Sequence, residues 1–521
     1  MKRTYKFRTV KGIVEKEYNH IPIRYIIALL MAILEISAII GAVCLACYYV
    51  PLLYTVCVVI SGFCIVKIIA SDDNPDYKAP WLICVISLPV VGFMLYFMFY
   101  SRRLKRKYIK RIKEVQSYDY EWNDTALFEK LKGEDRIAYS QAKMLTEISY
   151  SHLFSGTEQT YFSSGESMRD AMIADLRQAK KFILLEYFII EEGKFWGEIL
   201  DVLKCKVKEG VDVRVIYDDI GCIGTLPGNY DRILNSYGIK TVIFSKLRGS
   251  ADSEFNNRNH RKIMVIDGVI GYTGGVNIAD EYVNEKQLYG HWKDGGIRLF
   301  GDAVKELTKL SLMNFGLNSK QLPKAPEIPY PKRAFPDCCG YVIPFGDGPR
   351  PIYKRNVSKC TLQNMISSAV DYVYMTTPYL IIDNDLCSDI ERAALRGVDV
   401  RIIVPHIPDK KLVFTMTRSF YHRLMDAGVK IYEYEPGFIH AKTYLADGKY
   451  AMVGTVNLDY RSLAHHFEDG VWMYKCDSIK DIKADMDKTL EKCVAVTQDM
   501  LKTGYLSRLF RSFIRIFAPM L

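Results

Sequence analysis

Two stretches of the sequence carry the same spaced set of ionisable and amide side chains. Each has a His, a Lys two positions later, an Asp five positions after that, and then a Gly and an Asn at matching offsets. The first set is His260, Lys262, Asp267, Gly274 and Asn277, and the second is His440, Lys442, Asp447, Gly454 and Asn457. One H-x-K on a strand would be ordinary, but five matching positions indicate an internal duplication.

Paired imidazole and ammonium groups suit the chemistry of phosphodiesters. Lys ammonium groups and Asn amides bind phosphate oxygens and stabilise the charge that develops as phosphorus becomes five-coordinate. One imidazole can attack phosphorus while the other gives a proton to the leaving alcohol. Because the lysines supply positive charge, we expect no metal and no cofactor. The residues expected to meet are His260, Lys262, His440 and Lys442, with Asn277 and Asn457 as substrate-binding residues.

The role of the two Asp residues is open. His260 and Lys262 are two positions apart, so they point to the same face of a strand, whereas Asp267 has the opposite parity and precedes a Gly. The Asp-Gly pair predicts a turn between two strands. We therefore weigh a catalytic role for Asp267 and Asp447 equally with a structural one.

A histidine nucleophile needs an acceptor on its second ring nitrogen, which fixes the tautomer. The segments "HWKDG", from His291, and "HFEDG", from His466, resemble each other and follow the two motifs. Within them, Asp294 and Glu468 are the candidate acceptors. Three other histidines lie in or next to these segments, and we expect them to serve local structure or substrate contact: His291, His465 and His466. No role is assigned to His406 or His422.

The elements around the motifs repeat as well. In the first half, the strand-like "KFILLEYFII" and "GVDVRVIYDD" flank the helical pattern "FWGEILDVLKCKVKEG". In the second half, "DYVYMTTPYLII" and "GVDVRIIVPH" flank "LCSDIERAALRG". Strand, helix and strand in succession predict parallel strands joined by right-handed crossovers. The sequence therefore predicts an α/β protein with two lobes of similar topology.

The region from 21 to 100 is mostly apolar and predicts two or three transmembrane helices. Its three apolar segments, 25–49, 51–70 and 81–100, are each long enough to cross a bilayer. Both flanks are basic: the tail 1–20 before it and the juxtamembrane linker 101–150 after it. The positive-inside rule places both flanks in the cytoplasm, which needs an even number of crossings. Either one of the first two segments does not cross or one flank lies outside, and we expect a cytoplasmic catalytic domain.

Composition sets the remaining boundaries. We expect a first lobe over 151–321, a Pro-rich connector over 322–351, a second lobe over 352–503 and a basic amphipathic helix over 504–521. The connector has eight Pro, which disfavours helix and central strand. The chain has 13 Cys, which show no disulfide framework or zinc spacing, and a formal charge of +10. That charge suits anionic lipid, since no nucleic-acid motif accompanies it; the oligomeric state is left open.

The duplicated H-x-K-x4-D with its following G-x-x-N resembles the signature of the phospholipase D superfamily. The similarity extends from about residue 150 to the C-terminus. The segments "DDNPDYKAPWLICVISLPVVGFMLYFMF", "NRNHRKIMVIDG", "TGGVNIADEY" and "GTVNLDYRS" are similar, more narrowly, to bacterial cardiolipin synthases. Fold and function follow as expectations of this resemblance.

The resemblance implies two pseudo-symmetric phospholipase D-like lobes, with mixed sheets flanked by helices, sharing one active site after N-terminal transmembrane helices. It implies transfer of the phosphatidyl group of one phosphatidylglycerol to a second, giving cardiolipin and glycerol, in the bacterial cell membrane. His260 would be the nucleophile and His440 the acid, then base. Two alternatives stay open: a phospholipase or phosphodiesterase using water or another alcohol, and a non-enzymatic membrane scaffold.

Overall fold

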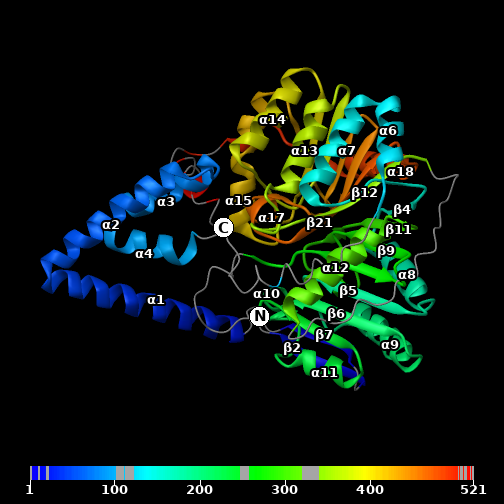
Figure 1. The fold of residues 1–521 in the computed structure, drawn as a ribbon, viewed down its shortest axis with the longest axis horizontal. Helices are drawn as coiled ribbons and strands as arrows, with labels where there is room; N and C mark the ends of the chain where they lie inside the picture. The colour runs from blue at the N-terminus through cyan, green and yellow to red at the C-terminus, as the bar shows by residue number, and fades with distance from the viewer. Residues whose placement is uncertain are drawn as a thin grey trace.

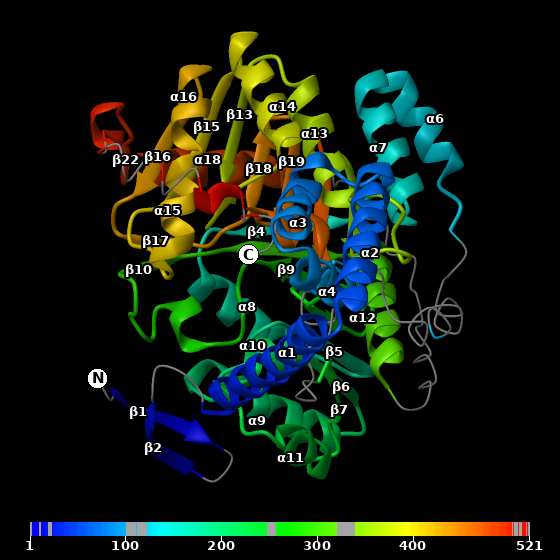
Figure 2. The same cartoon turned by 90° about the vertical axis from the view of Figure 1, so that its left-hand side faces the viewer.

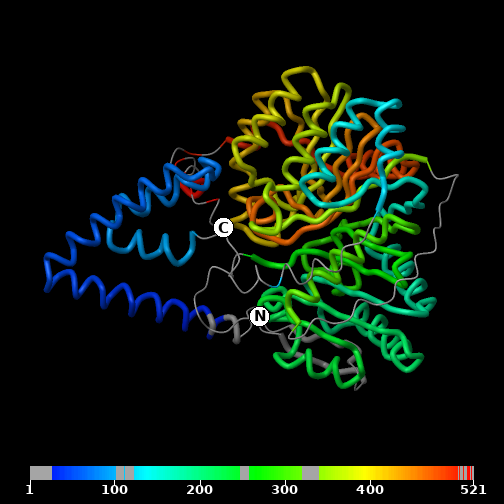
Figure 3. The backbone as a smooth tube through the Cα atoms, viewed as in Figure 1, coloured from blue at the N-terminus to red at the C-terminus, as the bar shows by residue number. Residues whose placement is uncertain are grey.

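The computed structural model has two α/β lobes stacked on each other and a helical arm that projects to one side (Figure 1). It describes residues 3–9, 12–18, 23–100, 111, 122–246, 257–319, 339–502, 504, 509, 513–516 and 518. The backbone trace separates the first lobe, mostly green, from the second, yellow to orange (Figure 3).

The first lobe is built on a seven-stranded sheet of order β4-β11-β9-β8-β5-β6-β7. Its strands are β4 (Glu158–Phe162), β5 (Phe182–Tyr187), β6 (Asp212–Asp218), β7 (Lys240–Phe244), β8 (Lys262–Ile266), β9 (Ile270–Gly274) and β11 (Gly296–Phe300). Its helices are α8 (Gly165–Leu176), α9 (Lys194–Lys208), α10 (Asp219–Cys222), α11 (Tyr230–Ser236) and α12 (Val304–Asn318).

The second lobe is built on a nine-stranded sheet of order β22-β16-β15-β13-β18-β19-β21-β12-β3. Its strands are β3 (Phe154–Ser155), β12 (Tyr341–Asp347), β13 (Tyr372–Thr376), β15 (Asp399–Pro405), β16 (Lys430–Tyr434), β18 (Thr443–Ala446), β19 (Tyr450–Gly454), β21 (Glu468–Tyr474) and β22 (Cys493–Ala495). Its helices are α13 (Val357–Ser368), α14 (Asn384–Leu395), α15 (Lys411–Ser419), α16 (Tyr421–Asp426), α17 (Tyr460–Ala464) and α18 (Ser478–Leu490).

Seven strands occur in the same order in both lobes, from β7-β6-β5-β8-β9-β11-β4 to β16-β15-β13-β18-β19-β21-β12. The expected parallel pairs are present, because β5 and β6 are parallel across α9 and β13 and β15 are parallel across α14. The motif strands β8 and β18 run antiparallel to β5 and β13, so each sheet is mixed. The fold expected from the resemblance is therefore confirmed.

One of the apolar cores lies between the two lobes and includes side chains of both. Buried side chains of β5 and β8 of the first lobe pack with those of β18, β19 and β21 of the second, together with α12 and α18. Two short strands strengthen this contact, since β10 (His291–Lys293) pairs in parallel with β17 (Gly437–Ile439) of the other lobe. The site between the lobes is thus held by packing and by backbone hydrogen bonds.

Three of the expected boundaries are wrong. The expected linker 101–150 contains α6 (Thr125–Glu134) and α7 (Arg136–Ser149), and α7 packs on the core of the second lobe. The strand β3, expected in the first lobe, extends the second sheet. The last part of the expected connector is β12, which includes Pro344. A strand tolerates this proline because β3 pairs only with Tyr341 and Val342, which leaves β12 an edge beyond them.

The arm comprises α1 (Ile23–Tyr49), α2 (Pro51–Ala70), α3 (Pro75–Ser87) and α4 (Pro89–Phe99). Two of its helices, over Leu29–Tyr49 and Pro51–Ala70, are long and apolar enough to cross a membrane. The N-terminal tail before them, expected only to be basic, forms a hairpin of β1 (Arg3–Thr9) and β2 (Gly12–Tyr18).

The third apolar segment, expected to be long enough to span, is interrupted. Leu88 has φ −132° and ψ 73°, between the end of α3 and the start of α4. The interruption has a steric cause, because the residue before a proline is disfavoured in the helical region, and Pro89 follows. With 13 and 11 residues, α3 and α4 each fall short of the roughly 20 that a span needs.

The arm docks on the second lobe at the start of α3. Asn74 donates its amide N–H to Asp383 at 2.9 Å, and Asp76 accepts the backbone N–H of Asn384 at 2.6 Å. Tyr77 donates to the carbonyl of Tyr460 at 3.2 Å. The view along the arm has α3 against the second lobe, while α1 runs below it (Figure 2).

Most of the expected helix 504–521 lies outside the described residues. Residues 513–516 are helical, and Ile514 and Ala518 are buried against the second lobe. Arg515, one of the basic residues of this segment, lies over the ring of Phe420 at 4.3 Å.

Candidate active site

Each motif histidine is held by the backbone of the opposite lobe. His260 donates its backbone N–H to the carbonyl of Phe467 at 2.9 Å, and His440 donates to the carbonyl of Lys293 at 2.7 Å. Both histidines precede their motif strands and are only 7% exposed. The two sequence motifs therefore meet between the lobes as expected.

The acceptors for the two imidazoles are exchanged between the lobes. His260 Nδ1 lies 3.0 Å from the carboxylate of Glu468 in the second lobe. His440 Nδ1 lies 2.7 Å from Asp294 Oδ2 in the first. Both carboxylates are fully buried. Each lobe thus supplies the histidine of one pair and the acid of the other, which pattern reading within one half does not reveal.

The sheet register corrects the alignment of the acid segments. Gly274 pairs with Gly296 and Gly454 pairs with Gly470, so Gly296 and Gly470 are equivalent. Counting back two residues makes Asp294 equivalent to Glu468. The similarity of "HWKDG" to "HFEDG" is out of register by one residue, because it matches the visible Asp-Gly pairs rather than the strand positions.

Burial and nearby charge set the protonation of the histidines. Burial, together with the Lys262 ammonium, lowers the pKa of His260 to about 3, although Glu468 opposes the shift. Burial and Lys442 lower the pKa of His440 to about 4. Both imidazoles are neutral near pH 7, with Nδ1–H donating to the carboxylates. Although burial alone would raise it, the pKa of Glu468 is held below its usual range by His260. Each Nε2 therefore carries a free lone pair.

The two lysines add positive charge at the same place. Lys262 donates to the carbonyl of His260 at 2.8 Å, and Lys442 donates to the carbonyl of His440. Burial lowers the pKa of Lys262 to about 8. Burial, together with repulsion from Lys262, lowers the pKa of Lys442 to about 7. That repulsion acts across the lobes, so both ammonium groups add positive charge to the same part of the site.

The two asparagines lie after the paired strands. Asn277 is buried, and its carbonyl oxygen accepts the backbone N–H of Ile189 at 3.0 Å. Asn457 is also buried, and its carbonyl oxygen has no hydrogen-bond partner among the described residues. Their side chains are thus not used equally, and Asn457 has the greater capacity left for a ligand.

The two aspartates lie at the ends of the motif strands away from the histidines. Asp267 accepts three backbone N–H groups, from Lys180, Lys181 and Phe182, at 2.7–3.0 Å. Asp447 accepts the equivalent three, from residues 370–372, each at 2.9 Å. Both have positive φ, 53° and 52°, in the turn after the strand. This geometry favours the structural alternative over the catalytic one.

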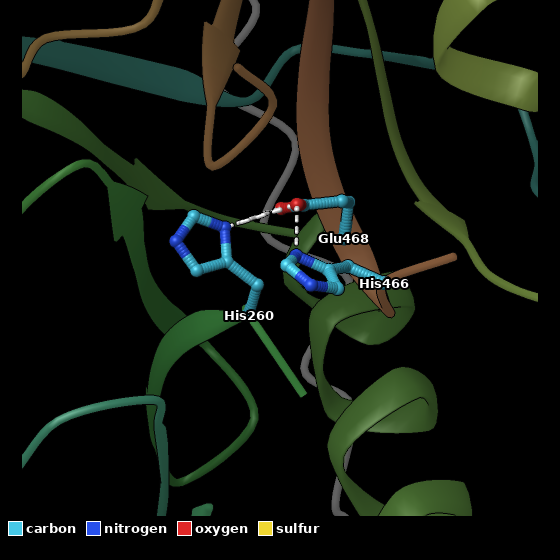
Figure 4. A group of neighbouring side chains, drawn as sticks. All are labelled: His260, His466 and Glu468. Atoms are coloured by element: carbon cyan, nitrogen blue, oxygen red, sulfur yellow. Dashed lines mark hydrogen bonds and ion pairs between the residues drawn. The ribbon is translucent and has the colours of Figure 1, made fainter. Parts of the chain in front are cut away.

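Two side chains next to the motif imidazoles occupy equivalent positions in the two lobes, which the sequence did not indicate. Trp292 and His466 both stand two residues before the acids, and their rings lie 5.3 Å from His440 and 5.6 Å from His260. Trp292 Nε1 lies 3.4 Å from Asp294, and His466 Nδ1 lies 3.7 Å from Glu468 (Figure 4). The sheet register, rather than residue identity, is the signal that pairs them.

Glu468 has two further partners that sequence reasoning missed. Thr455 and Ser462 donate hydroxyl hydrogens to its carboxylate at 2.5 and 2.6 Å. One ring nitrogen of His260, one of His466 and a Glu468 oxygen lie within 4.8 Å of one another, a set that could hold a metal ion. From the sequence we expect no metal here, and that stays a prediction.

The other histidines lie outside this cluster. His291 Nδ1 lies 3.1 Å from the hydroxyl of Tyr434, and the His465 ring lies 5.9 Å from that of Tyr77. His406 contacts Glu433 at 3.0 Å, and His422 contacts Gln498 at 3.1 Å. For His291 and His465, local structure is what the contacts support.

The chain matches a family model described as "Cardiolipin synthase, PLD-like domain" over residues 172–287 and 362–490. A second model, "Phospholipase_D-nuclease N-terminal", matches residues 59–99. A protein named cardiolipin synthase 2 from Bacillus cereus is 34% identical over 475 residues, 89% of this chain and 90% of that one. An uncharacterized protein from Streptococcus mutans is 40% identical over 85% of this chain and 96% of its own length.

Among solved structures, phosphatidylserine synthase from Haemophilus influenzae is similar in fold, with a TM-score of 0.55 and 15% identity. The similarity covers 73% of this chain and 98% of that one. Sequence similarity over most of both chains, and two matched domains that coincide with the two lobes, lead to one conclusion. The chain belongs to the phospholipase D-like cardiolipin synthase family.

Proposed function

We propose that the chain joins two phosphatidylglycerol molecules into cardiolipin and releases glycerol. The observation that carries this is the pair of exchanged His–carboxylate contacts, which leaves two neutral imidazoles beside two lysines in one buried site. A phosphoryl group bound by the lysines would have one Nε2 on each side. That arrangement suits two successive displacements at phosphorus.

In the first step, His260 Nε2 attacks the phosphorus of one phosphatidylglycerol. The bond from phosphorus to the glycerol headgroup oxygen breaks, and protonated His440 gives its proton to that oxygen. The bound phosphodiester supplies the negative charge that favours this protonated state. Lys262 and Lys442 stabilise the equatorial oxygens, and Asn457 adds an amide donor.

In the second step, the hydroxyl of another phosphatidylglycerol attacks the phosphohistidine. His440 takes the hydroxyl proton as the new oxygen–phosphorus bond forms and the phosphorus–nitrogen bond breaks. His260 is released neutral, with its Nδ1–H still directed at Glu468. The assignment of His260 as nucleophile follows the family resemblance, while the exchanged acids support either direction.

The test is turnover of purified protein with phosphatidylglycerol in mixed micelles containing a metal chelator. We expect cardiolipin and glycerol in equal amounts. Phosphatidic acid without cardiolipin would show that water is the acceptor and would replace this proposal with a phospholipase. A protein that turns over no phosphodiester would favour the scaffold.

We also propose that α1 and α2 cross the membrane and that both basic flanks lie in the cytoplasm. Two spans satisfy the even number of crossings that the positive-inside rule requires, and the interrupted α3–α4 pair stays on the side of the lobes. Tyr48, 79% exposed at the turn between the spans, would face outward.

Labelling with an impermeant maleimide tests this topology. In intact cells, Tyr48→Cys should be labelled above the wild-type background, whereas the exposed native Cys205 should react only after permeabilisation. Labelling of Cys205 in intact cells would place the lobes outside.

A further inference from the structure

His466 is a titratable group that the proposed reaction does not use. Trp292 occupies the equivalent position beside His440, so the other half of the site needs no ionisable side chain there. Both ring nitrogens of His466 are buried, and among the described residues the contact of Nδ1 with Glu468, at 3.7 Å, is too long for a hydrogen bond. Its side chain is 12% exposed, so this is a largely desolvated imidazole with unused capacity.

The neighbours of His466 complete a set of metal donors. One nitrogen of His466, one of His260 and a carboxylate oxygen of Glu468 lie within 4.8 Å of one another (Figure 4). Two imidazoles and a Glu are a common ligand set for zinc and prefer it to the hard cations magnesium and calcium. In a tetrahedral site the donors lie about 3.4 Å apart. The contacts of Glu468 with His260 at 3.0 Å and with His466 at 3.7 Å are already close to that spacing.

We propose that His260, His466 and Glu468 bind a zinc-like divalent cation, and that its binding blocks the reaction. The cation takes the position of the proton between His260 Nδ1 and Glu468. Nδ1 loses its hydrogen to the lone pair of Nε2, so the imidazole stays neutral but changes tautomer. Nε2–H has no lone pair with which to attack phosphorus.

Only the inhibition, not the binding, rests on the proposed function. The side of the site around His440 cannot bind zinc in the same way, because Trp292 offers no metal ligand.

The charges around the cluster set the strength of zinc binding. The ammonium groups of Lys262 and Lys442 oppose a cation, and the carboxylates of Glu468 and Asp294 favour it. Thr455 and Ser462 each use one position on Glu468, which leaves lone pairs of this carboxylate for the metal. We therefore expect micromolar affinity, weaker than that of a closed structural zinc site.

The experiment uses the full-length protein, purified in detergent and stripped with a chelator that is then removed. Zinc is titrated in competition with a chromogenic chelator, for the wild type, His466→Gln, His466→Trp and the control His422→Gln. His422 is exposed and its Nδ1 lies 3.1 Å from the amide oxygen of Gln498, away from the motif histidines, so its variant controls for loss of any histidine. We expect one equivalent in the wild type and control, and binding about 10- to 100-fold weaker in both His466 variants.

Two further readouts make the result decisive. Zinc should raise the melting temperature of the wild type and the control but not that of either His466 variant. Phosphodiester turnover, expressed relative to the zinc-free rate of each protein, should fall with zinc only in the wild type and control.

Equal zinc affinity in the wild type and both His466 variants would overturn the site. Wild-type binding without loss of turnover would overturn the tautomer argument. Because binding is measured without substrate, it remains testable in a protein whose reaction differs from the one proposed.

Discussion

The two halves of the site share their histidine–carboxylate and lysine–carbonyl contacts but differ in the ring that lies beside each histidine. In each, a buried histidine donates to a carboxylate of the other lobe, and a lysine donates to the carbonyl of that histidine. Beside His440 stands Trp292, and beside His260 stands His466. The duplication has thus kept the groups that act on phosphorus and diverged in the residue behind them. The two histidines are equivalent in position but not in surroundings.

Replacing each motif histidine in turn should have the largest effect and should show how the roles of His260 and His440 differ. His260→Ala and His440→Ala should each lower cardiolipin formation by roughly 10⁴-fold or more, because nucleophile and acid both serve every turnover. A phosphodiester with a nitrophenol leaving group needs no protonation, so it separates the two. His440→Ala should accumulate a covalent adduct on His260, detected as a mass increase of the intact protein. An adduct only in His260→Ala would exchange the two roles.

The exchanged acids predict that damage to one lobe disables the histidine of the other. Glu468→Gln and Asp294→Asn should each lower turnover by roughly 10²- to 10⁴-fold, because the amide no longer fixes the tautomer. The matched control is Asp469→Asn. Burial raises the pKa of Asp469 to about 7, so the amide resembles its neutral form, which still accepts from Thr273. A loss in the control as large as in Glu468→Gln would mean disturbed packing between the lobes.

The pH dependence of kcat/KM should show how Lys262 and Lys442 differ. Lys442, with a pKa lowered to about 7, and Lys262, with a pKa lowered to about 8, bind phosphate only when protonated. We therefore expect kcat/KM to fall as pH rises above about 7. Lys442→Arg keeps its charge, so the decline should move to higher pH, while the acid side of the profile stays in place. A decline at unchanged pH would assign it to another group.

The smallest effect on chemistry is expected at the two turns. Asp267→Asn and Asp447→Asn should each lower the free energy of unfolding by about 1–3 kcal/mol, because an amide satisfies fewer of the three backbone N–H groups. Thermal unfolding in detergent should give similar losses for both, with the rate of the folded fraction near that of wild type. A 100-fold loss of rate with unchanged stability would restore the catalytic alternative.

Repetition made the motif chemistry predictable from sequence. Identical offsets around His260 and His440 identified the catalytic candidates, and alternating strands and helices identified the lobes. The exchange of acids was not predictable, because the Glu468 contact depends on how β21 of one lobe meets β8 of the other. From the sequence, we expect His466 to serve local structure or substrate contact and match its segment with the one that starts at His291. Only the sheet register aligns His466 with Trp292 instead.

The missed boundaries have a common physical origin. Residues of α6 and α7 follow a basic stretch, so local composition resembled a linker, although Leu131 and Leu145 are buried in the second lobe. Pro344 disfavours a strand because proline has no backbone N–H to donate, but a strand at the edge of a sheet tolerates it. Hydropathy alone predicts three apolar segments of similar length. Pro89 interrupts the helix of the third one.

The docking of the arm has a consequence for the order in which the protein is made. Asn74 and its partner Asp383 are 309 residues apart, and the intervening chain includes the whole first lobe. At about 5–20 residues per second, the partner leaves the ribosome roughly 15–60 s after the arm. Glu468, on which His260 depends, is made later still. The apolar helices α1 and α2 are therefore synthesised before the reactive groups can assemble, and the nascent chain becomes competent only when its last strands have been synthesised.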